Sequence, residues 1–437
     1  MEIEAWQSLV HVCQRWRNLI FGSPRRLNLQ LYCTPKSPAR DTLDVWPALP
    51  LLIYFEGDEV SSSGMSNIIA AFQRSDRVRQ IGLRHVAGWQ LEEVLAAMQV
   101  PFPELTGIIM ELSWGETDFQ TAPAAPVIPD SFLGGSAPRL RYFELFGISF
   151  PGLPKLLLSA THLVELCLFI PNSGYISPEA MVAVLSVLSS LVRFNLGFEF
   201  LQSPRDWEDR SLPPPNRSIL PALRRLDFQG VTEYVEELVT RIDTPQLDDI
   251  HLTLLSQIGT PRLAQFINRT SFSAGDEARL TFHNWINSVE LLCRVTRVWN
   301  LYISIFCPDQ ERQLSSLAQI CNPLHSLSTI EGLYIEPRNS QLVWMNNAID
   351  NTLWLRLLLP FTAVKNLYLS KLFTPSIAAS LQELVGDRII EVLPSLQNIF
   401  VEGLEPSRVG PLQEIFGHFV AARQLSDHPI AISVWEE

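Results

Sequence analysis

Cysteine is scarce in this sequence, and the few thiols lie too far apart for the usual cysteine-based sites. No two of them form a C-x-x-C pair, and no histidine pair stands beside them at metal-ligand spacing. They are Cys13, Cys33, Cys167, Cys293, Cys307 and Cys321. Scattered thiols of this kind are typical of a reducing compartment. We therefore expect reduced cysteines, no bound metal and no cofactor.

Targeting segments and long apolar runs are also missing. Residues 1–16 lack the charged-then-apolar pattern of a signal peptide. No apolar run approaches the roughly 18 residues that a membrane span needs. We expect a cytoplasmic or nuclear protein that has no membrane partner.

Positive charge is in short supply. Lys and Arg number 33 against 46 Asp and Glu, which gives a formal net charge of −13. No basic run is longer than Arg25-Arg26 or Arg224-Arg225. Because a phosphate-binding surface needs clustered Lys and Arg, nucleic acid is not expected as a partner.

Recognised catalytic motifs are absent too. The sequence contains no G-x-G-x-x-G, P-loop, G-x-S-x-G or H-E-x-x-H segment. Asp248 and Asp249 are adjacent, so on a strand they would point to opposite faces. Glu236 and Glu237 are likewise adjacent, and neither pair makes a carboxylate dyad. We predict that the protein is not an enzyme and assign no catalytic residue.

What the chain does contain is a repeated apolar pattern, apolar-x-x-apolar-x-apolar. Eleven windows fit it, and they begin at Val78, Leu105, Leu140, Leu163, Leu191, Leu223, Leu247, Val298, Ile330, Val364 and Leu396. A weaker window around Leu280 and Phe282 fills the one large gap, and Leu49 begins a further window upstream. The steps between windows are close to the roughly 20 to 29 residues of leucine-rich repeats, with some longer insertions.

Each repeat is predicted to be a short strand followed by a helix. Pro precedes many of the strand windows, and Ser177-Pro178, Thr260-Pro261 and Thr374-Pro375 are helix-start signals, a hydroxyl N-cap followed by Pro. This alternation predicts an α/β, leucine-rich-repeat-like solenoid, a curved parallel sheet with helices on its outer face and about 12–14 irregular repeats. The repeats are irregular because the Asn or Cys that usually follows the strand is replaced, for example by Ile148 or Phe306.

The domain organisation follows from the same pattern. Residues 1–22 are predicted to form a partial F-box-like helix or N-terminal cap, and residues 23–437 the solenoid. Residues 116–138 and 201–221 are rich in Pro, Ala and Ser and fall between strands. We interpret them as loop insertions on the surface.

The amino-terminal segment has a helical apolar face. Trp6, Leu9, Cys13, Trp16 and Ile20 fall at three- and four-residue steps, which places them on one side of a helix. The run Val12-Cys-Gln-Arg-Trp-Arg-Asn-Leu19 resembles the final helix of an F-box. With the continuation Phe21-Gly-Ser-Pro-Arg-Arg-Leu27 and Leu43-Asp44-x-Trp46-Pro47, it is similar to fungal (basidiomycete-type) F-box proteins with irregular leucine-rich repeats.

The resemblance implies a function in ubiquitination. Proteins of that family bind a Skp-type adaptor of an SCF-type cullin–RING ubiquitin ligase through the F-box and capture a protein substrate on the repeats. The Leu-Pro-x-Glu segment that opens an F-box does not precede the helix here, so we expect an F-box truncated at its N-terminal part. Trp6, Leu9, Cys13 and Trp16 would either face the adaptor or cap the open end of the solenoid. The alternative is a leucine-rich-repeat scaffold that has no link to a ubiquitin ligase.

The variable strand positions suggest where an unknown protein substrate would bind. The residue before the last apolar position is aromatic in four windows, at Tyr302, Tyr334, Tyr368 and Phe400. Parallel strands lie about 4.8 Å apart, so these rings are predicted to stack across four repeats. Two residues before three of these rings are the amides Asn300, Asn366 and Asn398. We predict a partner-binding stripe there. The alternatives are that the rings only stabilise the sheet, or that the apolar tail 430–435 covers them.

Overall fold

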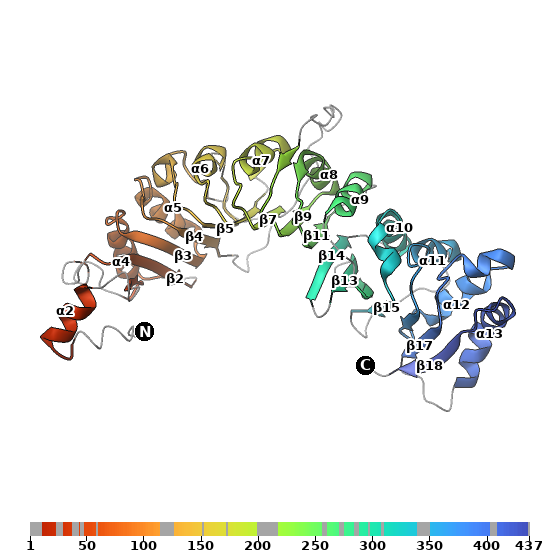
Figure 1. Ribbon diagram of the computed structural model, residues 1–437. Coiled ribbons are helices and arrows are strands. Elements are labelled where there is room, and N and C mark those ends of the chain that lie inside the picture. Colours follow the sequence, from red (N-terminus) through yellow and green to blue (C-terminus); the bar gives the residue numbers. More distant parts are fainter. Residues whose placement is uncertain are drawn as a thin grey trace. The chain divides into compact units, whose positions relative to one another are not determined.

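The computed structural model consists of strands that alternate with helices, as the repeat predicts. The chain divides into two compact units, Met1–Glu199 and Phe200–Glu437. In each unit the helices lie along one side of the strands (Figure 1). The structure describes residues 11–22, 29–36, 43, 48–57, 60–113, 126–150, 153–171, 174–198, 217–255, 260–270, 275–283, 288–295, 298–306, 310–338, 350–402 and 409–435.

The first unit is a parallel sheet in which each strand pairs with the next along the chain. Its strands, in sequence and in space, are β1 (Leu31–Cys33), β2 (Leu51–Glu56), β3 (Val78–Val86), β4 (Gly107–Leu112), β5 (Tyr142–Phe146), β6 (Glu165–Ile170) and β7 (Arg193–Phe198). Its helical segments are α2 (Gln14–Gly22), α4 (Ser62–Phe72), α5 (Gly88–Ala97), η1 (Phe132–Gly135), α6 (Leu153–Ser159) and α7 (Pro178–Leu185).

The second unit is mainly parallel. Across its sheet the strands are β9 (Arg225–Gly230), β11 (Asp249–Leu254), β14 (Val298–Phe306), β13 (Ser288–Val295), β12 (Glu277–His283), β15 (Gly332–Pro337), β16 (Asn366–Leu369), β17 (Asn398–Glu402) and β18 (Ala431–Trp435). A small parallel pair joins β8 (Ser218–Ile219) to β10 (Ile242–Asp243). Its helical segments are α8 (Thr232–Arg241), α9 (Pro261–Arg269), α10 (Gln310–Cys321), η3 (His325–Thr329), α11 (Asn351–Leu358), α12 (Thr374–Gln382), η5 (Gly386–Ile390) and α13 (Val409–Leu425).

One part of the second unit departs from the predicted parallel order. Strands β12, β13 and β14 form an antiparallel meander. Their order in the sheet is the reverse of their order in the sequence, so β14 pairs with β11 and β12 pairs with β15. A parallel connection needs a crossover of a dozen or more residues. Only two residues separate Val295 from Val298, so this connection can only be antiparallel.

The apolar positions of the repeated pattern form the core. On β6, Leu166 and Leu168 are buried while Cys167 between them is half-buried, and the same alternation runs through β9 and β11. The buried face is covered by the helices, and the other face of each sheet carries the variable residues. The predicted leucine-rich-repeat-like α/β solenoid is confirmed.

The predicted helix starts are only partly correct. Ser177 accepts a hydrogen bond from the backbone N–H of Ala180 at 3.2 Å, as an N-cap should. Thr260 makes no such bond at the start of α9. Thr374 is already the first residue of α12, and its hydroxyl donates to the carbonyl of Ser370 at 2.8 Å.

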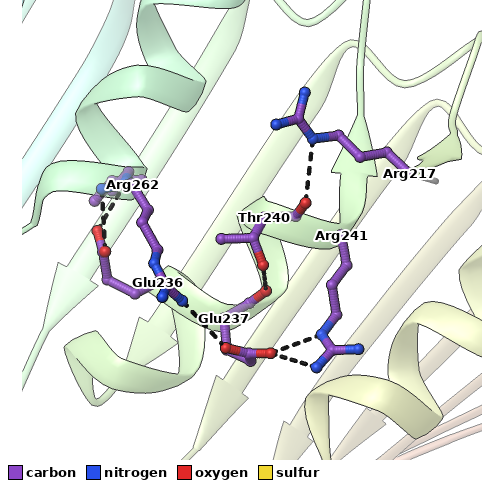
Figure 2. Close-up of polar contacts among 7 residues, drawn as sticks. Arg217, Glu236, Glu237, Thr240, Arg241 and Arg262 are labelled. Atoms are coloured by element: carbon purple, nitrogen blue, oxygen red, sulfur yellow. Dashed lines mark hydrogen bonds and ion pairs between the residues drawn. The ribbon is translucent and has the colours of Figure 1, made fainter. Parts of the chain in front are cut away.

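A carboxylate from the preceding helix caps α9 instead (Figure 2). Glu236 of α8 accepts hydrogen bonds from the backbone N–H groups of Arg262 at 3.1 Å and Leu263 at 2.7 Å. The neighbouring Glu237 pairs with Arg241 on its own helix and with Arg262 at 3.3 Å. The two adjacent glutamates therefore join one repeat to the next, because the first turn of α9 is held by side chains of α8.

Parts of both predicted loop insertions are ordered into the fold. Ile128 donates its backbone N–H to Ser149 at 2.9 Å, and Phe132 and Leu133 are buried. Residues 217–221 contain β8. Residues 116–125 and 201–216 lie outside the described residues. Within the described ranges, no helix is both long and apolar enough to cross a membrane.

Candidate partner-binding surface

The face of the second unit's sheet that the helices leave uncovered carries one continuous row of side chains. The strand register places these residues side by side from β9 to β18: Asp227, His251, Tyr302, Leu292, Arg279, Tyr334, Tyr368, Phe400 and Ser433. The row changes character along the sheet, from ionic at β9 and β11 to aromatic at β15, β16 and β17. This open face is therefore the surface on which a binding site has to be sought.

Three rings form a close stack, which we call the aromatic stack: Tyr334, Tyr368 and Phe400. The rings of Tyr334 and Tyr368 are 4.2 Å apart between centroids and inclined by 4°. Those of Tyr368 and Phe400 are 4.7 Å apart and inclined by 10°. The spacing is close to that of neighbouring strands, so the sheet itself holds the rings parallel.

Two further side chains border the stack. Trp435 packs edge-on against Tyr334 at 6.2 Å and Tyr368 at 5.7 Å between ring centroids. Arg279 lies over the Tyr334 ring, with its guanidinium carbon 5.1 Å from the centroid. The sequence pattern does not predict Arg279 beside Tyr334, because that contact depends on the pairing of β12 with β15. The tail strand β18 thus covers part of the stack, and all three stacked rings stay half-buried rather than fully covered.

The environment of the stack is polar at its edges. Burial, the charge of Glu277 and the neighbouring Tyr368 raise the pKa of Tyr334 to about 12. The indole N–H of Trp435 finds no acceptor among the described residues. On the same face, Asn398 donates to the side-chain oxygen of Asn366 at 2.8 Å. The surface therefore combines flat apolar rings with amides and one unused donor.

Tyr302 does not belong to the stack, and its predicted place beside Tyr334 is wrong. It lies on β14, and the reversed meander inserts β13 and β12 between it and β15. Its ring instead contacts His251, with centroids 5.8 Å apart, and its hydroxyl donates to Glu290 at 2.7 Å. Asn300 lies on the same strand and donates to the carbonyl of Asp248 at 3.2 Å.

The contacts of Tyr302 define a separate polar cluster. Glu290 is close to His283 at 3.0 Å and to Arg338 at 3.5 Å. Burial acts to raise the pKa of Glu290, but the hydrogen bonds from His283 and Tyr302 outweigh it and lower that pKa. Burial and the bond to Glu290 raise the pKa of Tyr302 to about 12. The hydroxyl of Tyr302 and the nearby His283 and Arg338 therefore favour the charged form of Glu290.

The ionic end of the row is also internally paired. Arg225 donates to both carboxylate oxygens of Asp227, at 2.8 and 2.9 Å, and lies 3.1 Å from Asp249. His251 lies 3.0 Å from Asp249. The hydrogen bond to Asp227 raises the pKa of Arg225 despite its partial burial. The part of the chain that the structure describes contains no group of three or more potential metal ligands.

The amino-terminal helix presents its apolar side chains outwards. In α2, Trp16 is 47% exposed and Leu19 is 60% exposed, whereas Ile20 is buried. Cys13, just before the helix, is also exposed. Trp6 and Leu9 lie outside the described residues. Trp16 and Cys13 are therefore not covered by any described residue of the first unit.

Comparison with known proteins does not add to the fold assignment. No protein-family model matches the sequence, and no curated protein matches it significantly. The crystal structure of the leucine-rich repeat-containing protein LegL7 from Legionella pneumophila matches at 12% identity, with 89% of this chain and 98% of that chain covered and a TM-score of 0.27. So low a score carries no argument, and the fold assignment rests on the strand register and burial described above.

Proposed function

We propose that this chain is a protein-binding scaffold and that the aromatic stack, bordered by Trp435 and Arg279, is the centre of its binding surface. Solenoids offer extended surfaces because successive repeats align equivalent side chains. Here the alignment gathers four aromatic residues on adjacent strands. Aromatic residues and Arg dominate the energetics of protein interfaces, since they supply large contact areas at low entropic cost.

The single observation that supports this proposal is the stacking of Tyr334, Tyr368 and Phe400 on the face of the sheet opposite the described helices. Such pairs contribute about 0.5–1.5 kcal/mol each beyond the area they bury, so part of the stack's role is to stabilise the sheet. A rigid stack is also preorganised for binding, because the rings lose little further freedom when a partner packs on them.

Ser433 offers a test that leaves every ring in place. It is exposed, it lies in register with Phe400, and it borders the stack on β18. Ser433→Arg should block a partner from the rings without removing a ring contact. Tyr368→Ala should weaken capture by removing the middle of the stack, and Tyr175→Ala is the matched control, an exposed tyrosine of the first unit.

The measurement is quantitative capture of partners by the full chain and by each variant, with thermal unfolding recorded in parallel. We expect proteins that bind the wild type and Tyr175→Ala to be lost from both Ser433→Arg and Tyr368→Ala. The proposal fails if the folded Ser433→Arg variant captures the same proteins in the same amounts.

A second, finer function rests on the exposed face of α2. Trp16 and Leu19 lie one turn apart and point away from the core, as a helix that docks on another protein requires. We propose that this helix contacts a Skp-type adaptor, which would make the chain a substrate-recognition subunit of an SCF-type ubiquitin ligase. Its protein substrate would then bind on the aromatic stack.

Titration of a purified Skp-type adaptor against the chain tests this second function. Trp16→Ala and Leu19→Ala should each weaken binding, whereas Gln14→Ala, an exposed polar change on the same helix, should not. An adaptor that binds neither the wild type nor an upstream-extended chain leaves only the scaffold function.

A further inference from the structure

The open face of the first unit contains a hollow that the aromatic stack does not involve. Its volume is about 450 Å³, and it lies over β2, β3, β4 and β5. A volume of this size is in the range of small-molecule and side-chain pockets, roughly 300–1,000 Å³. The residues that shape it are Tyr54, Gly82, Arg84, Gly107, Tyr142 and Glu144.

Two glycines create the hollow. Gly82 lies in register between Tyr54 and Ile109, and Gly107 lies between Gln80 and Tyr142, all on the open face. A Cβ at Gly82 would lie 3.0 Å from the Tyr54 ring, so the ring would have to shift by a few tenths of an ångström to admit a side chain. A Cβ at Gly107 would meet only ordinary contacts, at 3.7 and 3.8 Å. A Cβ therefore fits at Gly107 without moving its neighbours, and a larger side chain there would extend into the hollow.

The walls carry tyrosines and carboxylates. Tyr32 and Tyr54 are 53% and 41% exposed, and the Tyr54 hydroxyl donates to Glu56. Glu144 is half-buried, and it makes no hydrogen bond or ion pair with any described residue. Burial raises the pKa of Glu144, while the charges of Arg84 and Arg193 act to lower it and that of Glu165 acts to raise it. A half-buried carboxylate that accepts no hydrogen bond is stabilised when a donor reaches it.

We propose that this hollow binds a basic side chain, arginine or lysine, of a partner protein. The cation would lie against the tyrosine rings, where the ring quadrupole attracts it, and reach Glu144 at the far wall. Glu56 adds a second carboxylate, and Arg84 is the one cation among the described residues that line the hollow. The balance of charge therefore favours a positive guest. This site is distinct from the aromatic stack, and its proposed function does not depend on a partner binding to the stack.

The test uses Nα-acetyl-arginine amide as the probe and its neutral isostere, Nα-acetyl-citrulline amide, as the comparison. Binding to the full chain is followed by saturation-transfer NMR. A hydrogen bond to a charged group contributes roughly 1.5–3 kcal/mol, which corresponds to about a tenfold or greater preference for arginine over citrulline. Glu144→Gln should remove that preference, and Gly107→Leu should abolish binding of both probes.

The controls separate this site from the rest of the molecule. Glu402→Gln removes a carboxylate from the open face of β17 and should leave arginine binding unchanged, as should Tyr368→Ala. Unfolding curves establish that Gly107→Leu is folded, and Glu144→Gln tests the site without adding bulk. Equal binding of arginine and citrulline, no binding of either, unchanged binding in Gly107→Leu, or preference for Nα-acetyl-aspartate amide would each overturn the proposal.

Discussion

Replacing Glu236 should destabilise the second unit, because this one carboxylate holds the first turn of the next helix. It accepts from the backbone N–H groups of Arg262 and Leu263, and its side chain is almost entirely buried. Hydrogen bonds to a charged group contribute about 1.5–3 kcal/mol each. The two bonds share one carboxylate and are not additive, so we expect Glu236→Ala to cost about 3 kcal/mol.

Glu236→Gln should cost about half as much, since the amide keeps one acceptor oxygen and loses the charge that the helix terminus favours. At about 2–4 °C per kcal/mol for a unit of this size, the alanine variant should unfold about 6–12 °C lower. Urea unfolding followed by circular dichroism gives the free energy, and hydrogen exchange at the Leu263 amide reports the bond itself. Glu311→Ala, an exposed change on α10, is the control. A Glu236→Ala variant within about 0.5 kcal/mol of wild type, or unchanged exchange at Leu263, would refute the reasoning.

Other predictions follow from single contacts. Arg423 is fully buried and donates to the carbonyls of Val392, Leu393 and Pro394, so Arg423→Ala should cost about 3 kcal/mol or more in urea unfolding. Because the pKa of Glu290 is lowered in the folded state, this residue contributes to the free energy of unfolding above its unfolded pKa near 4.5, and the contribution is lost as the pH falls through the folded pKa. Glu290→Gln should therefore make the free energy of unfolding fall less steeply with decreasing pH in an acid-unfolding series. Cys13 is exposed while Cys33, Cys293 and Cys321 are buried, so a thiol reagent should modify Cys13 first. Burial raises the pKa of Cys33 to about 11, so this thiol should stay unreactive until the protein unfolds. Tyr302→Phe should remove one tyrosine that ionises near pH 12 from an absorbance titration.

Much of the fold could be predicted because the repeated pattern records burial directly. Leu166, Leu226 and Leu367 are completely buried where the pattern placed core positions. The variable positions could be read from the same register, which is why Tyr334, Tyr368 and Phe400 do lie side by side.

The reversed meander could not be predicted from periodicity. Leu280 and Leu301 are completely buried, as the core residues of the ordinary repeats are. Periodicity specifies which residues face the core, but it does not specify which strand pairs with which. The assumption that all strands run parallel in sequence order placed Tyr302 in the stack. The spacing between the windows at Leu280 and Val298 is the sequence feature that could have indicated the different pairing.

Tertiary contacts explain the other differences. Thr260 has the sequence of an N-cap, but Glu236 is 24 residues away and supplies a charged acceptor that the local sequence does not show. The hollow over Gly82 and Gly107 depends on two strands brought together by the sheet. Neither glycine is informative in the sequence alone.

Site-specific photo-cross-linking tests the proposed function most directly. A photoreactive phenylalanine analogue at Ala431 would lie beside Asn398, on the open face of β18 and near the aromatic stack, and the same analogue at Tyr175 would lie on the first unit. We expect a partner protein to cross-link from position 431 and not from 175, and the cross-link to disappear when Tyr368 is also replaced by Ala. Equal cross-linking from both positions, or a cross-link at 431 that survives Tyr368→Ala, would contradict a binding surface centred on the stack.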